Sequence, residues 1–443
     1  MSDVAETLET TVPEVHRPVP ARHILAATIG NGLEFYDFTT YAYFATQIGH
    51  AFFPSQSGMV SLLASLAVFG VGFVFRPIGG IVLGGYGDRV GRRPALVVSF
   101  TLMALSILAM ALLPAYATIG IAAPILVVVF RIVQGFALGG EVGSTNAFLL
   151  EAAPVESRGL FATFQGASQN VAGIIGGGVG VILSVALDLA HLDAWGWRIA
   201  FILGALTLPF GLILRRSLPE TLHRTETHTT HAPTEEGRSF AETHGRQIAL
   251  LFFIFASGTI GTYVFGYMTT YARTILHMDP RASFAVTVVS NLVGLVAGLA
   301  AGAYSDRVGR KPVMIWSRLL MIVAAYPVFL LIVRAHSPLA LLAGIGFLSF
   351  FSSASQAPTY AVLGESLPKS FRATGFSVIY ALAISIFGGS TQFVITWIIA
   401  ATGDKLAPAW YLLAASTIGL IAMILTEETA PAKVHGLARN SSL

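Results

Sequence analysis

The sequence has no cysteine in its 443 residues, which excludes disulfides, thiolate nucleophiles and cysteine-ligated metal sites. It is also poor in charge, because Asp, Glu, Lys and Arg together make up 11% of the chain, compared with about 25% in ordinary soluble domains. It contains no HExxH motif and no basic patch typical of nucleic-acid binding. Residues 1–20 lack an apolar core, so we do not expect a cleavable signal peptide. We accordingly expect no metal, no cofactor and no nucleic-acid partner.

Apolar residues dominate the rest of the composition. They form 54% of the chain, the mean hydropathy is +0.72, and there are 45 glycines, which membrane helices tolerate better than soluble helices do. Because a helix that crosses a bilayer needs about 20 apolar residues, the pattern predicts an all-α integral membrane protein with twelve transmembrane helices. The predicted spans are 22–47, 57–86, 94–114, 121–150, 159–188, 196–216, 247–273, 283–304, 312–334, 338–366, 373–400 and 408–426.

A polar stretch between the sixth and seventh spans divides the chain in two. The expected parts are an N-terminal tail at 1–21, a six-helix bundle at 22–216, a linker at 217–246, a second six-helix bundle at 247–426 and a C-terminal tail at 427–443. If both tails and the linker are cytoplasmic, 18 of the 26 basic residues lie on the cytoplasmic side and five on the other. Because Lys and Arg favour the cytoplasmic side, we expect a protein of the bacterial inner membrane with both termini in the cytoplasm.

Two loop motifs recur at equivalent places in the halves. "GGYGDRVGRRP" at 84–94 follows the second span, and "GAYSDRVGRKP" at 302–312 follows the eighth. "EAAPVESRG" at 151–159 and "ESLPKSFRATG" at 365–375 form a second pair after spans four and ten. The chain is therefore predicted to be an internal duplication, and parallel halves of this kind create a cavity at their interface near the bilayer midplane.

These motifs carry a family resemblance that covers almost the whole chain. The two G-x-x-x-D-R-x-G-R-[RK] motifs on twelve spans resemble the major facilitator superfamily. "GNGLEFYDF", "RPIGG", "RIVQGFALGGE" and "GWRIAFILG" are similar to segments of its metabolite:proton symporters. The segment 385–412 is most like the citrate and tricarballylate transporters. The resemblance implies alternating access, with the Asp88 and Asp306 loops holding a cytoplasmic gate closed in the outward-facing state.

Glu34 and Asp37 lie one turn apart, deep in the first predicted span. A carboxylate at the centre of a membrane helix costs about 2.5–3.5 kcal/mol on insertion scales. One interpretation is a buried ion pair with an arginine. The other is a proton carrier, since a carboxyl group in a low-dielectric cavity titrates nearer neutral pH. The two are compatible, because an acid can exchange an arginine partner for a proton.

Three arginines lie within predicted spans. Arg131, near the midplane, is expected either to pair with Glu34 or Asp37 or to bind a substrate carboxylate through two hydrogen bonds. Arg76 has the same possible role, with an ion pair near the helix end as an equal alternative. Arg318 is close enough to a helix end to reach the interface, so we assign it no role.

Further polar side chains are spaced along helix faces and predict a cavity wall, although any one of them could be an interhelical hydrogen bond. The residues expected to contact substrate are Asn31, Tyr41, Arg76, Arg131, Gln134, Gln165, Gln169, Tyr267, Gln356 and Tyr360. The buried ionisable groups lie almost entirely in the first half, so we expect proton coupling there. The glycines at 173–180 are expected to be a helix-packing face rather than a phosphate loop.

The expected gate consists of Asp88, Arg89, Arg92, Glu141, Glu151, Asp306, Arg307 and Arg310. The simpler alternative is that its arginines are only topology signals, but Asp and Gly at fixed places indicate more. We find no nucleophile–base pair and no appended soluble domain, so neither a membrane enzyme nor a sensor is favoured. The sequence therefore predicts a monomeric proton symporter for a small organic anion, a di- or tricarboxylate such as citrate. The alternative solute is zwitterionic or neutral, such as betaine, proline or a polyol acid.

Overall fold

The regular elements are all helical in the computed structural model, which describes residues 21–90, 92–139, 142–216, 244–368 and 372–433. The first half comprises α1 (Ala21–Tyr43), α2 (Ala45–Phe52), α3 (Gly58–Val74), α4 (Arg76–Val90), α5 (Arg92–Leu112), α6 (Tyr116–Ile119), α7 (Ala122–Ala137), α8 (Val142–Ala152), η1 (Val155–Ser157), α9 (Arg158–Ala186), α10 (Leu189–His191), η2 (Leu192–Gly196) and α11 (Trp197–Arg216). The second half comprises α13 (Gly245–Thr274), α14 (Pro280–Val308), α15 (Arg310–Ala335), α16 (Pro338–Glu365), α17 (Arg372–Ala383), η3 (Ile384–Gly388), α18 (Gly389–Thr402) and α19 (Ala407–Leu425).

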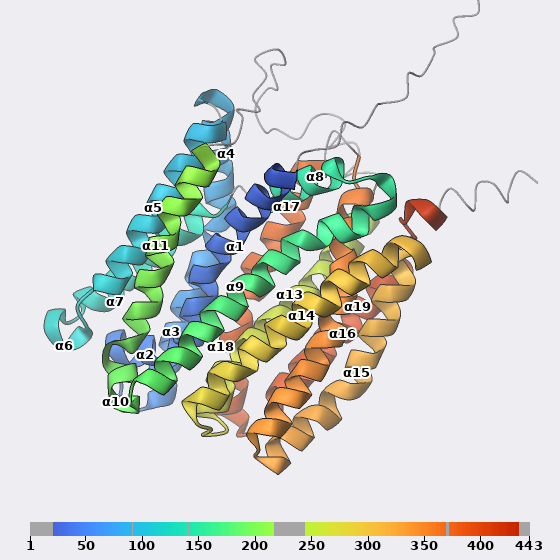
Figure 1. The fold of residues 1–443 in the computed structure, drawn as a ribbon. Coiled ribbons are helices and arrows are strands. Elements are labelled where there is room, and N and C mark those ends of the chain that lie inside the picture. The colour runs from blue at the N-terminus through green and yellow to red at the C-terminus, as the bar shows by residue number, and fades with distance from the viewer. Residues whose placement is uncertain (1–20, 91, 140–141, 217–243, 369–371, 434–443) are drawn as a thin grey trace, which may run out of the picture.

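The long helices run roughly side by side, with the two halves adjacent in space (Figure 1). Eight helical stretches among the described residues are long and apolar enough to cross a membrane, and two more apolar helices, Val97–Leu112 and Ala122–Ala137, are shorter. The many large apolar side chains on the outside, among them Ile81, Leu339 and Val323, suit contact with lipid. The predicted all-α, twelve-span membrane architecture of two halves is confirmed by the family matches reported below together with this fold.

Two of the predicted spans contain a break in the helix. The span 57–86 is interrupted at Phe75, between α3 and α4, because Pro77 cannot donate a backbone hydrogen bond. The span 121–150 is interrupted after Ala137, at the end of α7. At these breaks α4 and α7 approach so closely that a Cβ on Gly79 would collide with the backbone of Phe136. A small-residue contact of this kind is typical of membrane bundles.

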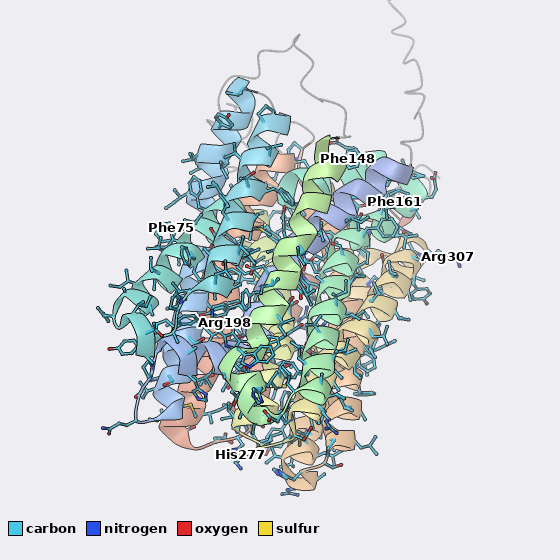
Figure 2. The ribbon with its side chains drawn as sticks, turned by 60° about the vertical axis from the view of Figure 1, so that its left-hand side comes forward. Phe75, Phe148, Phe161, Arg198, His277 and Arg307 are labelled. Atoms are coloured by element: carbon cyan, nitrogen blue, oxygen red, sulfur yellow. The ribbon has the colours of Figure 1, made fainter. Side chains whose placement is uncertain are left out.

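The halves meet along α9 and α14, which lie against each other over their length (Figure 1). The glycines of 173–180 form this contact: Gly173 lies on Asn291, Gly177 on Thr287 and Gly180 on Phe284. Their predicted role as a packing face is confirmed. The bundle has two ends, which we call the motif end, at Asp306 to Arg310, and the opposite end, at Asp193, Arg273 and His277. Figure 2 shows Arg307 and His277 at these two ends.

The domain limits remain predictions. Almost all of the expected linker at 217–246 and both expected tails fall outside the described residues, except for 244–246, 21 and 427–433. Three histidines of the linker region, at 223, 228 and 231, lie there too. Among the residues that the structure describes, no cluster of three or more His, Asp or Glu side chains could hold a metal.

Candidate functional site

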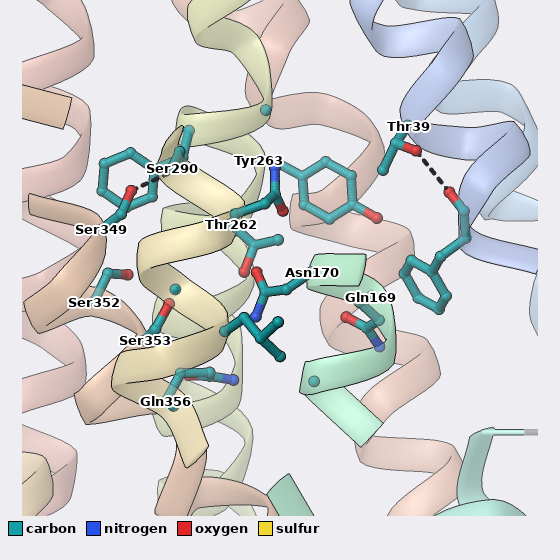
Figure 3. A pocket seen from close by; sticks show the side chains of 18 of the residues that line it. Thr39, Gln169, Asn170, Thr262, Tyr263, Ser290, Ser349, Ser352, Ser353 and Gln356 are labelled. Atoms are coloured by element: carbon teal, nitrogen blue, oxygen red, sulfur yellow. Dashed lines mark hydrogen bonds between the residues drawn. The ribbon is translucent and has the colours of Figure 1, made fainter. Parts of the chain in front are cut away.

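A cavity of about 120 Å³ lies between the two halves. Thr39, Gln169 and Asn170 line it from the first half and Ser349, Ser352, Ser353 and Gln356 from the second, with Thr262 and Tyr263 of α13 between them (Figure 3). The wall combines hydrogen-bonding groups with aromatic rings such as Phe38 and Phe69. Among the described lining residues there is no Asp, Glu, Lys, Arg or His. The cavity is therefore built to bind a polar solute through neutral hydrogen-bond groups.

Three of the predicted contact residues, Gln169, Gln356 and Tyr360, line this cavity. The other seven lie outside its lining: Asn31, Tyr41, Arg76, Arg131, Gln134, Gln165 and Tyr267. Several of these are engaged elsewhere. Gln165 donates to the Asn31 side chain at 2.8 Å, which ties α9 to α1, and the Tyr267 hydroxyl accepts from Thr396 at 2.9 Å. Their direct contact with substrate remains a prediction.

The cavity also contains residues that sequence reasoning did not select as site residues, notably Thr39, Tyr43, Asn170, Ser353 and Gln392. The helical spacing of serines and asparagines was a usable signal. That signal alone does not locate the cavity. The apolar faces toward lipid and toward protein look alike in these helices, so periodicity does not reveal which face turns inward.

Asp37 and Arg131 form a buried ion pair. The Nη1 group of Arg131 on α7 donates to Oδ2 of Asp37 on α1 at 3.3 Å, and both side chains are at most 1% exposed. Arg131 also lies over the Tyr41 ring at 3.7 Å. Among the described residues, Asp37 Oδ1 and Arg131 Nη2 have no hydrogen-bond partner. The pair is thus joined by a single hydrogen bond.

Glu34 is buried as well, at 2% exposed, but it does not line the cavity. Asp37, one turn further along the same helix, is paired with Arg131. Of the two alternatives for Arg131, pairing with an acid is the one this conformation contains.

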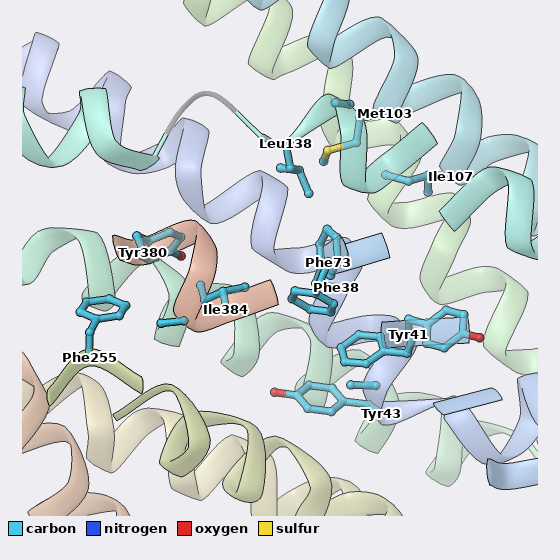
Figure 4. Close-up of a cluster of buried hydrophobic side chains, with 14 of the residues drawn as sticks. Phe38, Tyr41, Tyr43, Phe73, Met103, Ile107, Leu138, Phe255, Tyr380 and Ile384 are labelled. Atoms are coloured by element: carbon cyan, nitrogen blue, oxygen red, sulfur yellow. The ribbon is translucent and has the colours of Figure 1, made fainter. Parts of the chain in front are cut away.

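Arg76 lies directly behind the cavity wall. It is 5% exposed, and its guanidinium carbon stands 4.3 Å from the ring centroids of both Phe38 and Phe73. The two rings lie close together in Figure 4. Among the described residues no ion pair to Arg76 is found, and its Nε has no hydrogen-bond partner. Arg76 therefore packs against Phe38, which is one of the rings that line the cavity.

Arg318 contradicts our expectation that it reaches the membrane interface. It is fully buried, and its Nε donates to Ser355 Oγ at 3.1 Å. Its Nη1 and Nη2 have no partner within the described part of the chain. Distance from the helix end suggested exposure, but the rotation of α15 turns this side chain toward α16. The second half therefore has a buried cation of its own.

The motif end is closed by a charged network. Asp306 of α14 accepts hydrogen bonds from the backbone N–H groups of Gly159 and Leu160 at 2.8 and 3.0 Å. These donors belong to the first turn of α9, where backbone N–H groups lack helical partners and attract a carboxylate. Arg310 holds the same carboxylate at 2.7 Å and Glu365 at 3.0 Å. Asp306 thus connects the second half to the first.

This arrangement tests the predicted gate only in part. Arg310 pairs with Glu365 of its own half, whereas Glu151, another residue of the expected gate, is exposed. Arg307 is exposed too. The side chains of Asp88, Arg89 and Arg92 and the whole of Glu141 lie outside the described residues.

The opposite end is also closed across the halves. Arg273, in the last turn of α13, forms an ion pair with Asp193 of η2. Nearer the cavity, Asn291 of α14 donates to the Tyr43 hydroxyl of α1 at 3.2 Å. The halves are therefore in polar contact on both sides of the cavity.

Replacing Asp306 by Asn should loosen the motif end. The neutral amide loses the attraction to the α9 N-terminus and to Arg310, at a cost of about 1–3 kcal/mol. We expect faster labelling of a single cysteine placed at Ala167 by an impermeant maleimide added on the motif side. Tyr304→Phe, an exposed change on the same helix, is the control. Unchanged labelling together with weaker substrate binding would show that Asp306 is not part of a gate.

Comparisons with known proteins agree on one family. The model described as Major Facilitator Superfamily matches residues 27–297 and 251–441. The chain is 37% identical over 421 residues to a citrate-proton symporter of Salmonella typhi, covering 92% of this chain and 95% of that protein. It is also 37% identical to a citrate-proton symporter of Klebsiella pneumoniae, with 90% of each chain covered. A proline/betaine transporter of Salmonella typhimurium is 29% identical, over 93% of this chain and 84% of its own length.

Solved structures agree on the fold. A crystal structure of a D-xylose-proton symporter superposes with a TM-score of 0.75 at 18% identity, covering 93% of this chain and 99% of the other. A partially occluded inward-open xylose transporter of E. coli follows at a TM-score of 0.72 and 16% identity, covering 92% and 98%. At this identity the likeness concerns the fold alone.

Proposed function

The chain belongs to the major facilitator superfamily, and from that premise we propose that it is a secondary active transporter that imports citrate or a similar di- or tricarboxylate together with protons. It is a multi-pass membrane protein and not an enzyme. The observation that carries the proposal is the 37% identity to two citrate-proton symporters over at least 90% of the chain. The buried pair of Asp37 and Arg131 next to a solute cavity supports the coupling.

Proton and anion loading are linked through the arginines. In the unloaded protein Asp37 is the counter-ion of Arg131, and a proton on Asp37 weakens that attraction. The guanidinium then gains most from a substrate carboxylate, which can accept two parallel hydrogen bonds. Arg76, unpaired behind Phe38, offers a second cation for the same anion. Removing the proton restores the protein pair and expels the substrate.

Alternating access requires the two ends to open in turn. The Asp306 network serves as the gate of the motif end, and the Asp193–Arg273 pair serves as the gate of the opposite end.

From the distribution of Lys and Arg we propose that the motif end and both termini are cytoplasmic, in a bacterial inner membrane. We also propose that the transporter is a monomer. Glu34, Asp88, Arg89, Arg92, Glu141 and Glu151 keep their proposed coupling and gating roles.

One observation favours a second candidate, a symporter for a zwitterion such as betaine or proline. The described residues that line the cavity carry no Asp, Glu, Lys, Arg or His, which suits a solute without net charge. The relatives named as proline/betaine transporters are 29–32% identical.

Uptake into proteoliposomes decides between the two. Labelled citrate, succinate, betaine and proline are offered with and without an inwardly directed proton gradient. We expect citrate to accumulate only with the gradient. Accumulation of betaine or proline but of neither acid would establish the second candidate, and no gradient dependence for any solute would exclude proton symport.

A further inference from the structure

The break between α3 and α4 leaves a carbonyl without its helical donor. Pro77 has no N–H, so the usual bond from residue 77 to the carbonyl of Phe73, four residues earlier, cannot form. The hydroxyl of Ser385, in the second half, donates to this carbonyl at 2.7 Å. The Phe73 carbonyl also accepts from the backbone N–H of Phe75 at the end of α3, so the donor from across the interface is its second hydrogen-bond partner and takes the place of the bond that proline removes.

The donor itself lies in an irregular segment. Ser385 belongs to η3 (Ile384–Gly388), a single π-helical turn between α17 and α18, and such turns are frequent at functional sites. One turn away the two halves are in backbone contact, since a Cβ on Gly70 would lie 2.9 Å from the Gly389 carbonyl oxygen. The broken helix of one half thus fits against the π-turn of the other.

The same carbonyl belongs to a residue that holds Arg76. The ring of Phe73 lies 4.3 Å from the Arg76 guanidinium carbon and packs edge-on against Tyr263 of the cavity wall, 5.5 Å between centroids. Phe38 contacts the same guanidinium at 4.3 Å and packs edge-on against Phe73, 5.1 Å between ring centroids. Because Phe73 is fixed at its backbone by Ser385 and at its ring by Phe38 and Tyr263, it sets the position of the cation.

We propose that Ser385 is a positioning residue for anion binding, whose hydrogen bond to the Phe73 carbonyl holds Arg76 beside the cavity only while α3 and η3 stay together. The inference rests on the proposed function, because it takes Arg76 to be a carboxylate-binding group. The anion site then depends on both halves. When they separate at this contact, the Phe73 carbonyl keeps only its bond from the Phe75 N–H, the helix break relaxes, and the affinity for a carboxylate falls. Release of substrate would then follow from opening.

A double-mutant cycle tests this coupling. Citrate binding is measured by calorimetry for wild type, Ser385→Ala, Arg76→Gln and the double variant. We expect Ser385→Ala to weaken citrate binding about 5- to 10-fold, with no further loss when Arg76 is already Gln. Ser385→Thr, which keeps the hydroxyl, should restore binding. Ser390→Ala is the matched control, because that hydroxyl bonds to Ile386 within its own helix.

Additive losses in the cycle, or Ser385→Thr no better than Ser385→Ala, would overturn the inference. If Ser385→Ala does not fold, Ser385→Cys takes its place, since a thiol of similar size is a weak donor. A substrate-free readout separates this inference from the proposed function. In the naturally cysteine-free chain, maleimide labelling of Arg76→Cys should be about fivefold faster with Ser385→Ala than with Ser390→Ala. Equal rates reject the role of Ser385, whereas wild-type protein that binds no citrate rejects the proposed substrate.

Discussion

Replacing Asp37 by Asn should abolish accumulation of substrate against its gradient while leaving exchange of bound substrate measurable. Asn keeps the shape of the side chain but can neither release a proton nor neutralise Arg131. The variant therefore stays in the state that resembles protonated Asp37, and the proton gradient no longer drives the cycle. Import of an anion into a negative interior costs about 2.3 kcal/mol per charge per 100 mV. In this variant no coupled proton offsets that cost.

The measurement compares gradient-driven uptake with counterflow exchange in the same proteoliposomes. Glu34→Gln is tested in parallel, because Glu34 is the second buried acid of α1 and we expect it to be needed for uphill uptake too. At least one of the two variants should retain substrate binding. Full accumulation in both variants would show that neither acid carries the coupled proton.

Arg76→Gln should weaken carboxylate binding by about 2–5 kcal/mol, the usual effect of truncating one partner of a buried charge pair. Arg76 is the arginine beside the cavity for which the described residues provide no acid. Arg76→Lys keeps the charge but cannot donate two parallel hydrogen bonds to one carboxylate, so we expect an intermediate loss of binding affinity. Calorimetry with citrate, succinate and betaine gives the affinities.

Arg131 provides the comparison. Because it is already paired, Arg131→Gln leaves Asp37 as an uncompensated buried charge, which costs about 3–5 kcal/mol. We expect poor expression, partly rescued by the double change Arg131→Gln with Asp37→Asn. Arg131→Lys should fold and bind carboxylates less tightly than wild type. Tight betaine binding by wild type with no response to citrate or succinate would exclude the carboxylate class altogether.

Hydropathy and internal repetition were enough to predict the membrane class and the duplicated halves, and the resemblance of the motifs implied the transporter family. These properties are one-dimensional: a bilayer sets the length of each apolar run, and a duplicated motif is visible without knowing where it lies in space. The same reasoning singled out Asp37, Arg76 and Arg131, because a charge in an apolar run stands out wherever the helix points.

Only the tertiary structure decided what those charges do. Asp37 meets Arg131 from 94 positions away, and Ser385 meets the Phe73 carbonyl from 312 away. Such pairings depend on how each helix is rotated about its axis. In a membrane the lipid-facing and buried faces are both apolar, so the sequence pattern does not encode that rotation. For this reason Arg318 was misplaced. Pro77 shows in the sequence that the Phe73 carbonyl lacks its usual helical donor, but the donor from Ser385 became visible only once the two halves were packed together.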